Sequence, residues 1–124
     1  MPIRTSQLPN GIRIVTDTLS DVDSVALGVW VGVGTRHEDM SQNGVAHMLE
    51  HMLFKGTTKR TAGRIDQEVQ EAGGYMNAYT SFDRTVYYIN APNTGAKVAV
   101  DILCDIMQHA TLPADELVKE LDVI

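Results

Sequence analysis

Residues 25–33 alternate strictly between two kinds of side chain, and this pattern constrains the fold more than any other part of the sequence. A period of two is typical of a β-strand, because successive side chains point to opposite faces. One face would carry branched apolar residues, namely Val25, Leu27, Val29, Val31 and Val33. The other would carry Trp30 and otherwise small residues, Ala26, Gly28 and Gly32. We predict a strand that buries its valine face and leaves room for a closely packed element, such as a helix, on the second face.

Two β-hairpins are predicted on either side of the central helices. "LPNGIRIV" places Asn10-Gly11, the dipeptide of a tight turn, between two short strand-like runs. Further along, "YMNAYTS" and "TVYYINA" are rich in β-branched and aromatic residues and are separated by "FDR". Hairpins join antiparallel strands, so the sheet should be antiparallel.

Four helices are predicted. The first follows a loop, is capped by Ser41 or Asn43 and ends near Gly56; the second covers residues 61–72. A third starts at Asn93 or Thr94, and a fourth starts near Pro113 and runs to the last residues without a stop signal. The fold class is therefore α+β, an antiparallel sheet with helices packed against it. Residues 1–124 are interpreted as the N-terminal part of a single domain.

Composition excludes several classes of protein. The 124 residues carry a formal net charge of −6 and have no basic cluster, so a nucleic-acid partner is not expected. No apolar run is long enough to cross a bilayer, and "MPIRTSQLPNG" has no signal-peptide pattern. Cys104 is the single cysteine, which rules out an internal disulfide, and its apolar surroundings predict a buried thiol.

The motif "HMLEH" in the first predicted helix carries the chemistry. His47 and His51 are four residues apart, so both imidazoles lie on one helix face, and Glu50 projects beside them. Neutral imidazole is a good zinc ligand, and a carboxylate beside a zinc-bound water can take its proton. The alternative is a solvent-facing polar stripe on an amphipathic helix. Spacing alone leaves both interpretations open.

H-x-x-E-H is the inverted zincin signature, and the surrounding blocks strengthen the match. "GVAHMLEHMLFKGT", "GGYMNAYTSFDRTVYY" and "ELVKELDVI", with "LPNG" and "GVGTRHE" before them, occur in an order that resembles the pitrilysin, insulin-degrading enzyme and mitochondrial processing peptidase family. The processing-peptidase beta subunit and its bacterial relatives are most similar. The resemblance implies that His47 and His51 are ligands of Zn²⁺. It also implies that Glu50 is the general base of a metalloendopeptidase that cuts short or unfolded peptides, with zinc-bound water as nucleophile.

The resemblance also assigns roles to residues outside the motif. The family's third zinc ligand is a glutamate a few positions beyond Ile124, whereas Glu120 matches a glutamate that supports the catalytic site. From the residues alone, Glu120 would be a surface carboxylate. Asn77 and Ala78 would lie on a strand edge beside the metal and bind the substrate backbone; the alternative for Asn77 is a bond to its own backbone. Phe54 would line a pocket for a substrate side chain or, equally, belong to the core.

Two other functions remain open at this point. Without the third protein ligand, the chain could bind metal or peptide without hydrolysis. A non-catalytic structural paralogue is a further possibility, although the intact His47, Glu50 and His51 argue against it. The expected partners of the peptidase are a peptide substrate and a second homologous domain or subunit, as a homodimer or heterodimer. The expected compartment is the bacterial cytoplasm or, alternatively, the mitochondrial matrix.

Overall fold

The first hairpin of the computed structural model, which describes residues 3–123, is formed by β1 (Ile3–Gln7) and β2 (Arg13–Asp17). Leu8 N–H donates to Ile12 O at 2.8 Å, and Gly11 N–H donates to Leu8 O at 2.9 Å. Gly11 has a φ of 96°, a conformation that favours glycine. The turn chemistry of "PNG" therefore produces the predicted hairpin.

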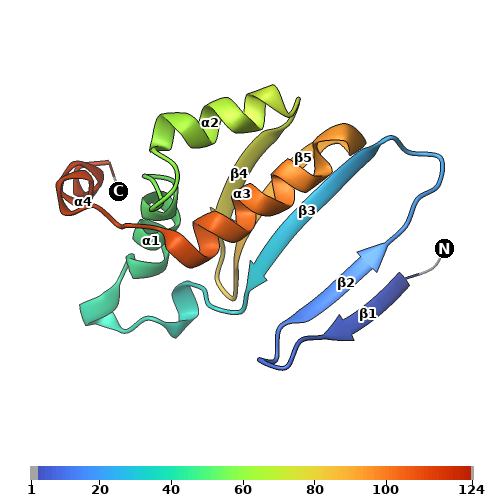
Figure 1. Cartoon of the computed structure of the whole chain (residues 1–124). Helices are drawn as coiled ribbons and strands as arrows, with labels where there is room; N and C mark the ends of the chain where they lie inside the picture. The colour runs from blue at the N-terminus through green and yellow to red at the C-terminus, as the bar shows by residue number, and fades with distance from the viewer. Residues whose placement is uncertain (1–2, 124) are drawn as a thin grey trace.

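A second, three-stranded sheet carries most of the core. Its order is β3 (Ser24–Val31), β5 (Thr85–Pro92), β4 (Tyr75–Thr80), and both pairings are antiparallel. β5 is central in this sheet, and β4 pairs only with β5 within residues 3–123 (Figure 1). The predicted antiparallel sheet and its second hairpin are confirmed, and β4 is an edge strand.

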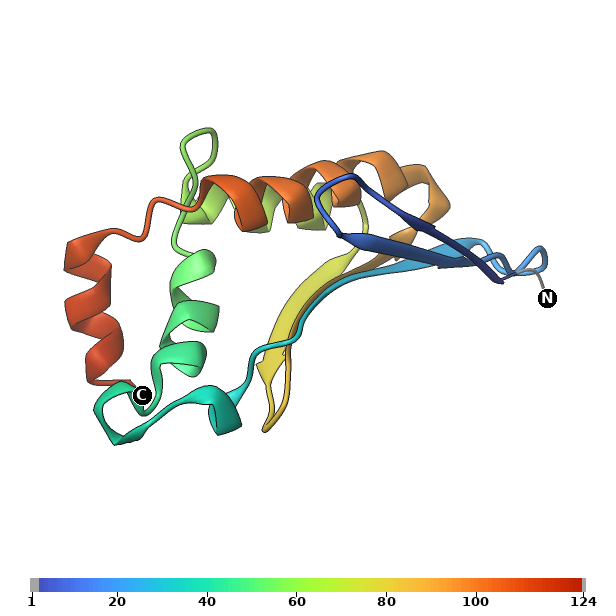
Figure 2. The same cartoon turned by 90° about the horizontal axis from the view of Figure 1, so that it is seen from below.

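Helices cover one side of this sheet (Figure 2). The helices that contact the sheet are α1 (Val45–Leu53), α2 (Ala62–Glu71) and α3 (Ala96–His109), of which α3 packs on β5 and β3. α4 (Ala114–Leu121) packs on α1, farther from the strands. Short 3-10 turns lie at Thr35–His37, Met40–Gln42 and Asn93–Gly95. The fold class is α+β, as predicted.

The core lies between the sheet and the helices. Its fully buried large side chains come from α2, β5 and α3: Ile65, Ile89, Ile102, Leu103 and Ile106. The alternating face of β3 packs against this core, as predicted, through Val25, Leu27, Val29 and Val31. Val33, predicted on the same face, lies beyond the end of β3 and is 48% exposed. The second face of β3 differs from the prediction. No helix within residues 3–123 covers it, and Trp30 is 67% exposed, because all four helices lie on the valine side.

The fourth helix spans Ala114–Leu121 within the described residues, and Asp122 is its C-cap; Ile124 lies outside these residues. The environment of the cysteine differs from the sequence prediction. Cys104 is exposed, not buried. It shares an exposed side of α3 with Val100, while Leu103 and Asp105 on either side of it are buried. The prediction was wrong because α3 has apolar residues on this exposed side as well as on its buried side.

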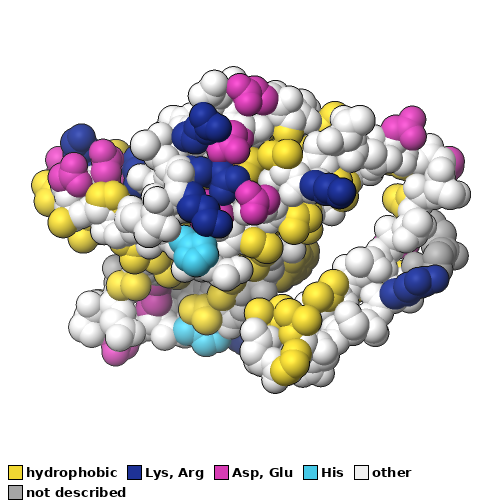
Figure 3. Space-filling model, viewed as in Figure 1, with side chains coloured by type: hydrophobic (Ala, Val, Ile, Leu, Met, Phe, Trp, Pro, Cys, Tyr) yellow, Lys and Arg dark blue, Asp and Glu magenta, His cyan; other side chains and the backbone are white. Residues whose placement is uncertain are grey.

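Hydrophobic side chains also reach the surface of the hairpin. Both strands of the hairpin are exposed throughout, including Ile3 at 65% and Val15 at 64%. Figure 3 shows hydrophobic side chains gathered at one end of this hairpin, apart from the helical layer. None of the helices within residues 3–123 has the length and apolar character needed to cross a bilayer.

Candidate functional site

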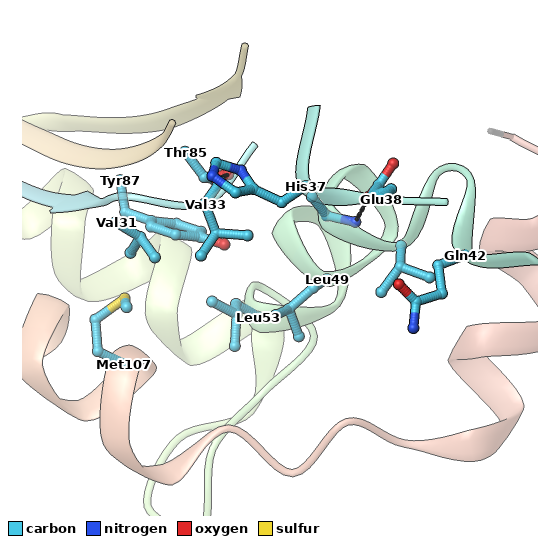
Figure 4. A pocket seen from close by; sticks show the side chains of 12 residues that line it. Val31, Val33, His37, Glu38, Gln42, Leu49, Leu53, Thr85, Tyr87 and Met107 are labelled. Atoms are coloured by element: carbon cyan, nitrogen blue, oxygen red, sulfur yellow. Dashed lines mark hydrogen bonds between the residues drawn. The ribbon is translucent and has the colours of Figure 1, made fainter. Parts of the chain in front are cut away.

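α1 holds the histidine motif, and a carboxylate from the preceding loop fixes its start. Glu38 Oε1 accepts a hydrogen bond from Gly44 N–H at 3.0 Å, and Oε2 accepts one from Ala46 N–H at 2.6 Å (Figure 4). The carboxylate oxygens accept hydrogen bonds from N–H groups that have no partner within the helix. Their negative charge also interacts favourably with the positive end of the helix dipole. Gly44 adopts a φ of 90°. The predicted caps, Ser41 and Asn43, do not fill this role, since Glu38 and Gly44 do.

His47 and His51 meet through the same ring nitrogen. The two Nε2 atoms are 3.1 Å apart, and the ring centroids are 4.7 Å apart with the planes at 79°. One ligand atom from each of His47, Glu50 and His51 lies within 4.8 Å of the others. The helical spacing predicted this convergence, and the structure brings the three side chains together.

Glu120 fixes the orientation of His51 from the opposite side of the ring. His51 Nδ1 lies 2.8 Å from Glu120 Oε2, and Lys55 Nζ donates to Glu120 Oε1 at 2.7 Å. These hydrogen bonds, first from Lys55 and then from His51, lower the pKa of Glu120, which is buried. An ionised carboxylate accepts, so Nδ1 carries a proton, and in a neutral imidazole of this tautomer Nε2 has the lone pair. The interpretation of Glu120 as a surface carboxylate is therefore wrong.

The donors fit a zinc ion. Two nitrogens bound tetrahedrally to one zinc lie about 3.3 Å apart, given Zn–N distances of about 2.05 Å. The observed 3.1 Å between the Nε2 atoms is close to this value. A carboxylate on the remote ring nitrogen is the usual partner of a zinc-bound histidine. Glu120 itself contacts Nδ1, so it does not occupy the side of the ring where Nε2 would bind metal.

Glu50 is the third group of the cluster and is held by β4. Thr80 Oγ1 donates a hydrogen bond to Glu50 Oε2. Tyr87 lies on the core side of this region, where its own burial, followed by the charge of Glu50, raises its pKa to about 12. The phenol therefore stays neutral at physiological pH. Glu50 keeps Oε1 as a further acceptor.

The edge strand β4 forms one wall of the hollow beside the cluster. The hollow has a volume of about 360 Å³ and is lined by Thr35, His47, Glu50, Ala78, Tyr79 and Thr80. Ala78 thus borders the same hollow as His47 and Glu50. Asn77 is not among the lining residues; its Oδ1 accepts a hydrogen bond from Ala78 N–H at 2.8 Å. An extended peptide that bonds to Ala78 N–H would replace this contact.

Phe54 lies at the end of α1, away from this hollow. It is partly buried against the core, and its ring centroid is 6.1 Å from that of Tyr87. A separate apolar cavity of about 320 Å³ opens between α1, the sheet and α3, with Val31, Leu49 and Met107 in its wall (Figure 4). Phe54 lines neither space, so its role toward substrate stays a prediction.

Three residues that shape the site were missed by the sequence analysis. Lys55 lies one turn after His51, and this i,i+4 spacing was a signal for a neighbour of the second histidine. Thr80 lies two residues after Ala78 and thus on the same face of the strand, which could have pointed to the hollow. Glu38 gave no comparable signal, since its cap spans an irregular loop.

Comparison with known proteins decides the family. The profile described as "Insulinase (Peptidase family M16)" matches residues 13–124. The chain belongs to the insulinase family of peptidases, family M16. The resemblance found in the sequence is therefore confirmed, and "HMLEH" is a match to H-x-x-E-H in a member of this family.

Relatives in this family include mitochondrial and bacterial proteins. The chain is 40% identical over 121 residues to a probable mitochondrial-processing peptidase subunit beta of Arabidopsis thaliana, covering 98% of this chain and 23% of that protein. It is 44% identical over 115 residues to an uncharacterized zinc protease of Bacillus subtilis, covering 93% and 28% respectively. The chain thus spans less than a third of the length of these M16 relatives.

A solved structure agrees with the fold. A protease from Helicobacter pylori superposes with a TM-score of 0.93 at 34% identity, covering 98% of this chain and 30% of that one. The hairpin, the three-stranded sheet and the helical layer therefore follow the arrangement of a known protease.

Proposed function

We propose that the full-length protein is a zinc-dependent metalloendopeptidase, with His47 and His51 as ligands of Zn²⁺ and Glu50 as general base. The observation that carries this proposal is the His47–His51 pair, whose Nε2 atoms converge at 3.1 Å while Glu120 holds Nδ1 of His51. The names of zinc protease relatives support the choice of metal. Zinc would supply a Lewis acid that polarises the peptide carbonyl and acidifies water.

Each residue of the site has a separate role in this proposal. His47 and His51 hold the metal, and Glu120 keeps His51 in the tautomer that can bind it. Glu50 accepts a proton from the attacking water and returns it to the amine that leaves, because its carboxylate lies beside the histidines and the hollow. Glu120 supports catalysis through His51 and does not touch the substrate.

Short or unfolded peptides are the substrate class that this site favours. β4 is an edge strand, and its Ala78 lines the same hollow as Glu50. An edge strand offers backbone groups only to a chain that is itself extended, and it does so with little regard to sequence. Ala78 and Asn77 are proposed to bind the substrate backbone, and Phe54 to contribute to a pocket for a side chain.

A second homologous domain or subunit is proposed as partner. Peptidases of this family have paired homologous domains. The hairpin exposes Ile3, Ile12 and Val15, and the uncovered face of β3 exposes Trp30. Apolar surfaces of this kind are typical of contacts with further protein. A homodimer or heterodimer would supply such contacts in the full-length protein.

The experiment that tests the proposed function substitutes the general base. In the full-length protein, Glu50→Gln should abolish peptide cleavage and retain zinc, because the amide keeps the shape but cannot accept the proton. Glu71→Gln, on the exposed side of α2, is the control and should cleave normally. Cleavage by the Glu50→Gln protein, or full zinc content after both histidines are changed to alanine, would refute the assignment.

One observation favours a second function for residues 1–124 on their own. Glu120 binds Nδ1 of His51 and so cannot complete the metal site at Nε2. With one protein ligand fewer, these residues would bind zinc or peptide without hydrolysis. Zinc content and peptide cleavage should therefore both be lower for this stretch than for the full-length protein. Equal activity of the two would contradict the need for a further ligand.

A further inference from the structure

Thr80 links the general base to the strand that borders the hollow. Its hydroxyl donates to Glu50 Oε2 across 30 residues of sequence, from the last residue of β4 to the middle of α1. Both side chains are half-buried, and both line the hollow together with Ala78 and His47. The contact therefore occurs inside the candidate site and not on the outer surface.

The hydrogen bond restrains a side chain that would otherwise rotate. A glutamate has three side-chain torsions, and a donor that holds one oxygen selects among their combinations. A hydroxyl donor to an ionised carboxylate makes one of the stronger hydrogen bonds in proteins. With Oε2 held by Thr80, Oε1 is the oxygen left to accept a proton.

β4 also places Thr80 on the same face of the strand as Ala78. Thr80 and Ala78 are two residues apart and point to the same face of the strand. A peptide added to the edge of β4 would be placed by the same strand that places the carboxylate. Catalysis depends on keeping reacting groups within fractions of an ångström, and a shared support achieves this.

We propose that Thr80 is a positioning residue, whose hydroxyl fixes Glu50 Oε2 and so aligns the general base with a peptide bound along β4. This inference rests on the proposed function, because it needs Glu50 to be the base. It adds a residue outside the histidine motif to the machinery of the site. Thr80 acts through Glu50 and forms no bond to substrate or metal.

Three variants of the full-length zinc-loaded protein test the proposal. Thr80→Val keeps the size and branching of the side chain and removes the donor. Thr80→Ser restores the donor on a smaller side chain. Thr85→Val is the matched control: Thr85 is the register partner of Thr80 on β5, but its hydroxyl donates to Val33 O at 2.8 Å and not to Glu50.

Kinetics should separate positioning from a merely structural role. We expect Thr80→Val to lower kcat about tenfold or more, since the hydrogen bond to a charged group is lost. KM should change less than about twofold, and Thr80→Ser should recover most of kcat. Thr85→Val should retain kcat. A Thr80→Val protein with normal kcat, or a Thr80→Ser protein as slow as Thr80→Val, would overturn the proposal.

Two measurements without turnover complete the test. Zinc affinity, measured by competition with a chelator, should be the same in Thr80→Val and wild type, because His47 and His51 are untouched. A crystal structure of Thr80→Val should show the Glu50 carboxylate displaced from its wild-type position. An unmoved carboxylate would overturn the proposal. If Glu50→Gln cleaves peptides, the proposed function itself fails, which is a different outcome from a failure confined to Thr80→Val.

Discussion

Glu120 accepts a hydrogen bond from His51 at 2.8 Å, although the two residues are 69 positions apart in the chain. In the proposed metal site, this contact would define the tautomer of His51 as a ligand. Glu120→Gln should therefore lower the zinc affinity of the full-length protein about 10- to 100-fold. Chelator competition measures the effect. Glu116→Gln, one turn earlier on α4, is the control, because Glu116 carries the same charge and lies 3.9 Å from Lys55 Nζ but does not contact His51. An equal loss of zinc affinity in the Glu120→Gln and Glu116→Gln proteins would contradict a specific role of Glu120.

Asn77 provides a test of the edge strand. Its Oδ1 accepts from Ala78 N–H in the present structure, and the proposed function assigns it to the substrate. Asn77→Ala should raise KM about tenfold, because losing one hydrogen bond to the substrate weakens binding by about that factor. The change in kcat should be smaller. Asn90→Ala is the control, since Asn90 donates to Tyr75 OH at 2.7 Å and does not line the hollow. An unchanged KM for Asn77→Ala would favour the alternative, a bond to its own backbone.

Arg60 should control stability at acid pH. It donates to Asp105 at 2.8 Å and to Glu68 at 2.7 Å. Burial works to raise the pKa of Asp105, but hydrogen bonds from Thr57 and Arg60 outweigh it and hold the pKa below 3.8. Arg60 likewise lowers the pKa of Glu68 below 4.5. Because the pKa values of Asp105 and Glu68 are both lower in the folded state, their ion pairs with Arg60 stabilise the fold above about pH 4.5. This contribution is lost as the pH falls through the folded-state pKa values.

Arg60→Gln should therefore destabilise the full-length protein by on the order of 3 kcal/mol at pH 7, since it leaves Asp105 buried and charged without its partner. The free energy of unfolding should also fall less steeply between pH 4.5 and lower pH than in wild type. Denaturant unfolding at several pH values measures both effects. Arg64→Gln is the control, because Arg64 contacts the same Glu68 but its side chain is 61% exposed; equal effects of the two variants would be the contrary result.

Glu38 should stabilise α1 by capping it. Glu38→Ala removes both acceptors from the N–H groups of Gly44 and Ala46 and should cost about 1–2 kcal/mol. In a domain of 150–250 residues this lowers the Tm by roughly 2–8 °C. Calorimetry on the full-length protein measures the shift. Glu71→Ala, at the exposed end of α2, is the comparison and should change the Tm little; a Glu38→Ala protein as stable as wild type would rule out the cap.

The elements of secondary structure were predictable because their signals are local. The alternation in β3 and the Asn-Gly turn of the first hairpin each act within a few residues, and each is present in the structure. The convergence of His47, Glu50 and His51 was predictable for the same reason, since all three lie within about one turn of one helix.

Contacts between distant segments could not be derived in this way. The bond from Thr80 to Glu50 depends on how β4 lies against α1, and no local pattern encodes that placement. The burial of Glu120 depends on α4 packing beside α1. The exposed side of Cys104 and the uncovered face of β3 likewise depend on which surfaces find a partner. An apolar pattern predicts that a face can be buried, but not by what.

The long separation between His51 and Glu120 has a consequence for how the chain matures. α1 brings His47 and His51 together as soon as one helix forms, whereas Glu120 reaches His51 only after the intervening strands and helices have closed a long loop. In the proposed zinc site, the histidine pair would therefore be available to metal early, and the orientation of His51 would be completed late. During synthesis, the docking of α4 would mark the moment at which a loose pair of imidazoles becomes an ordered ligand set.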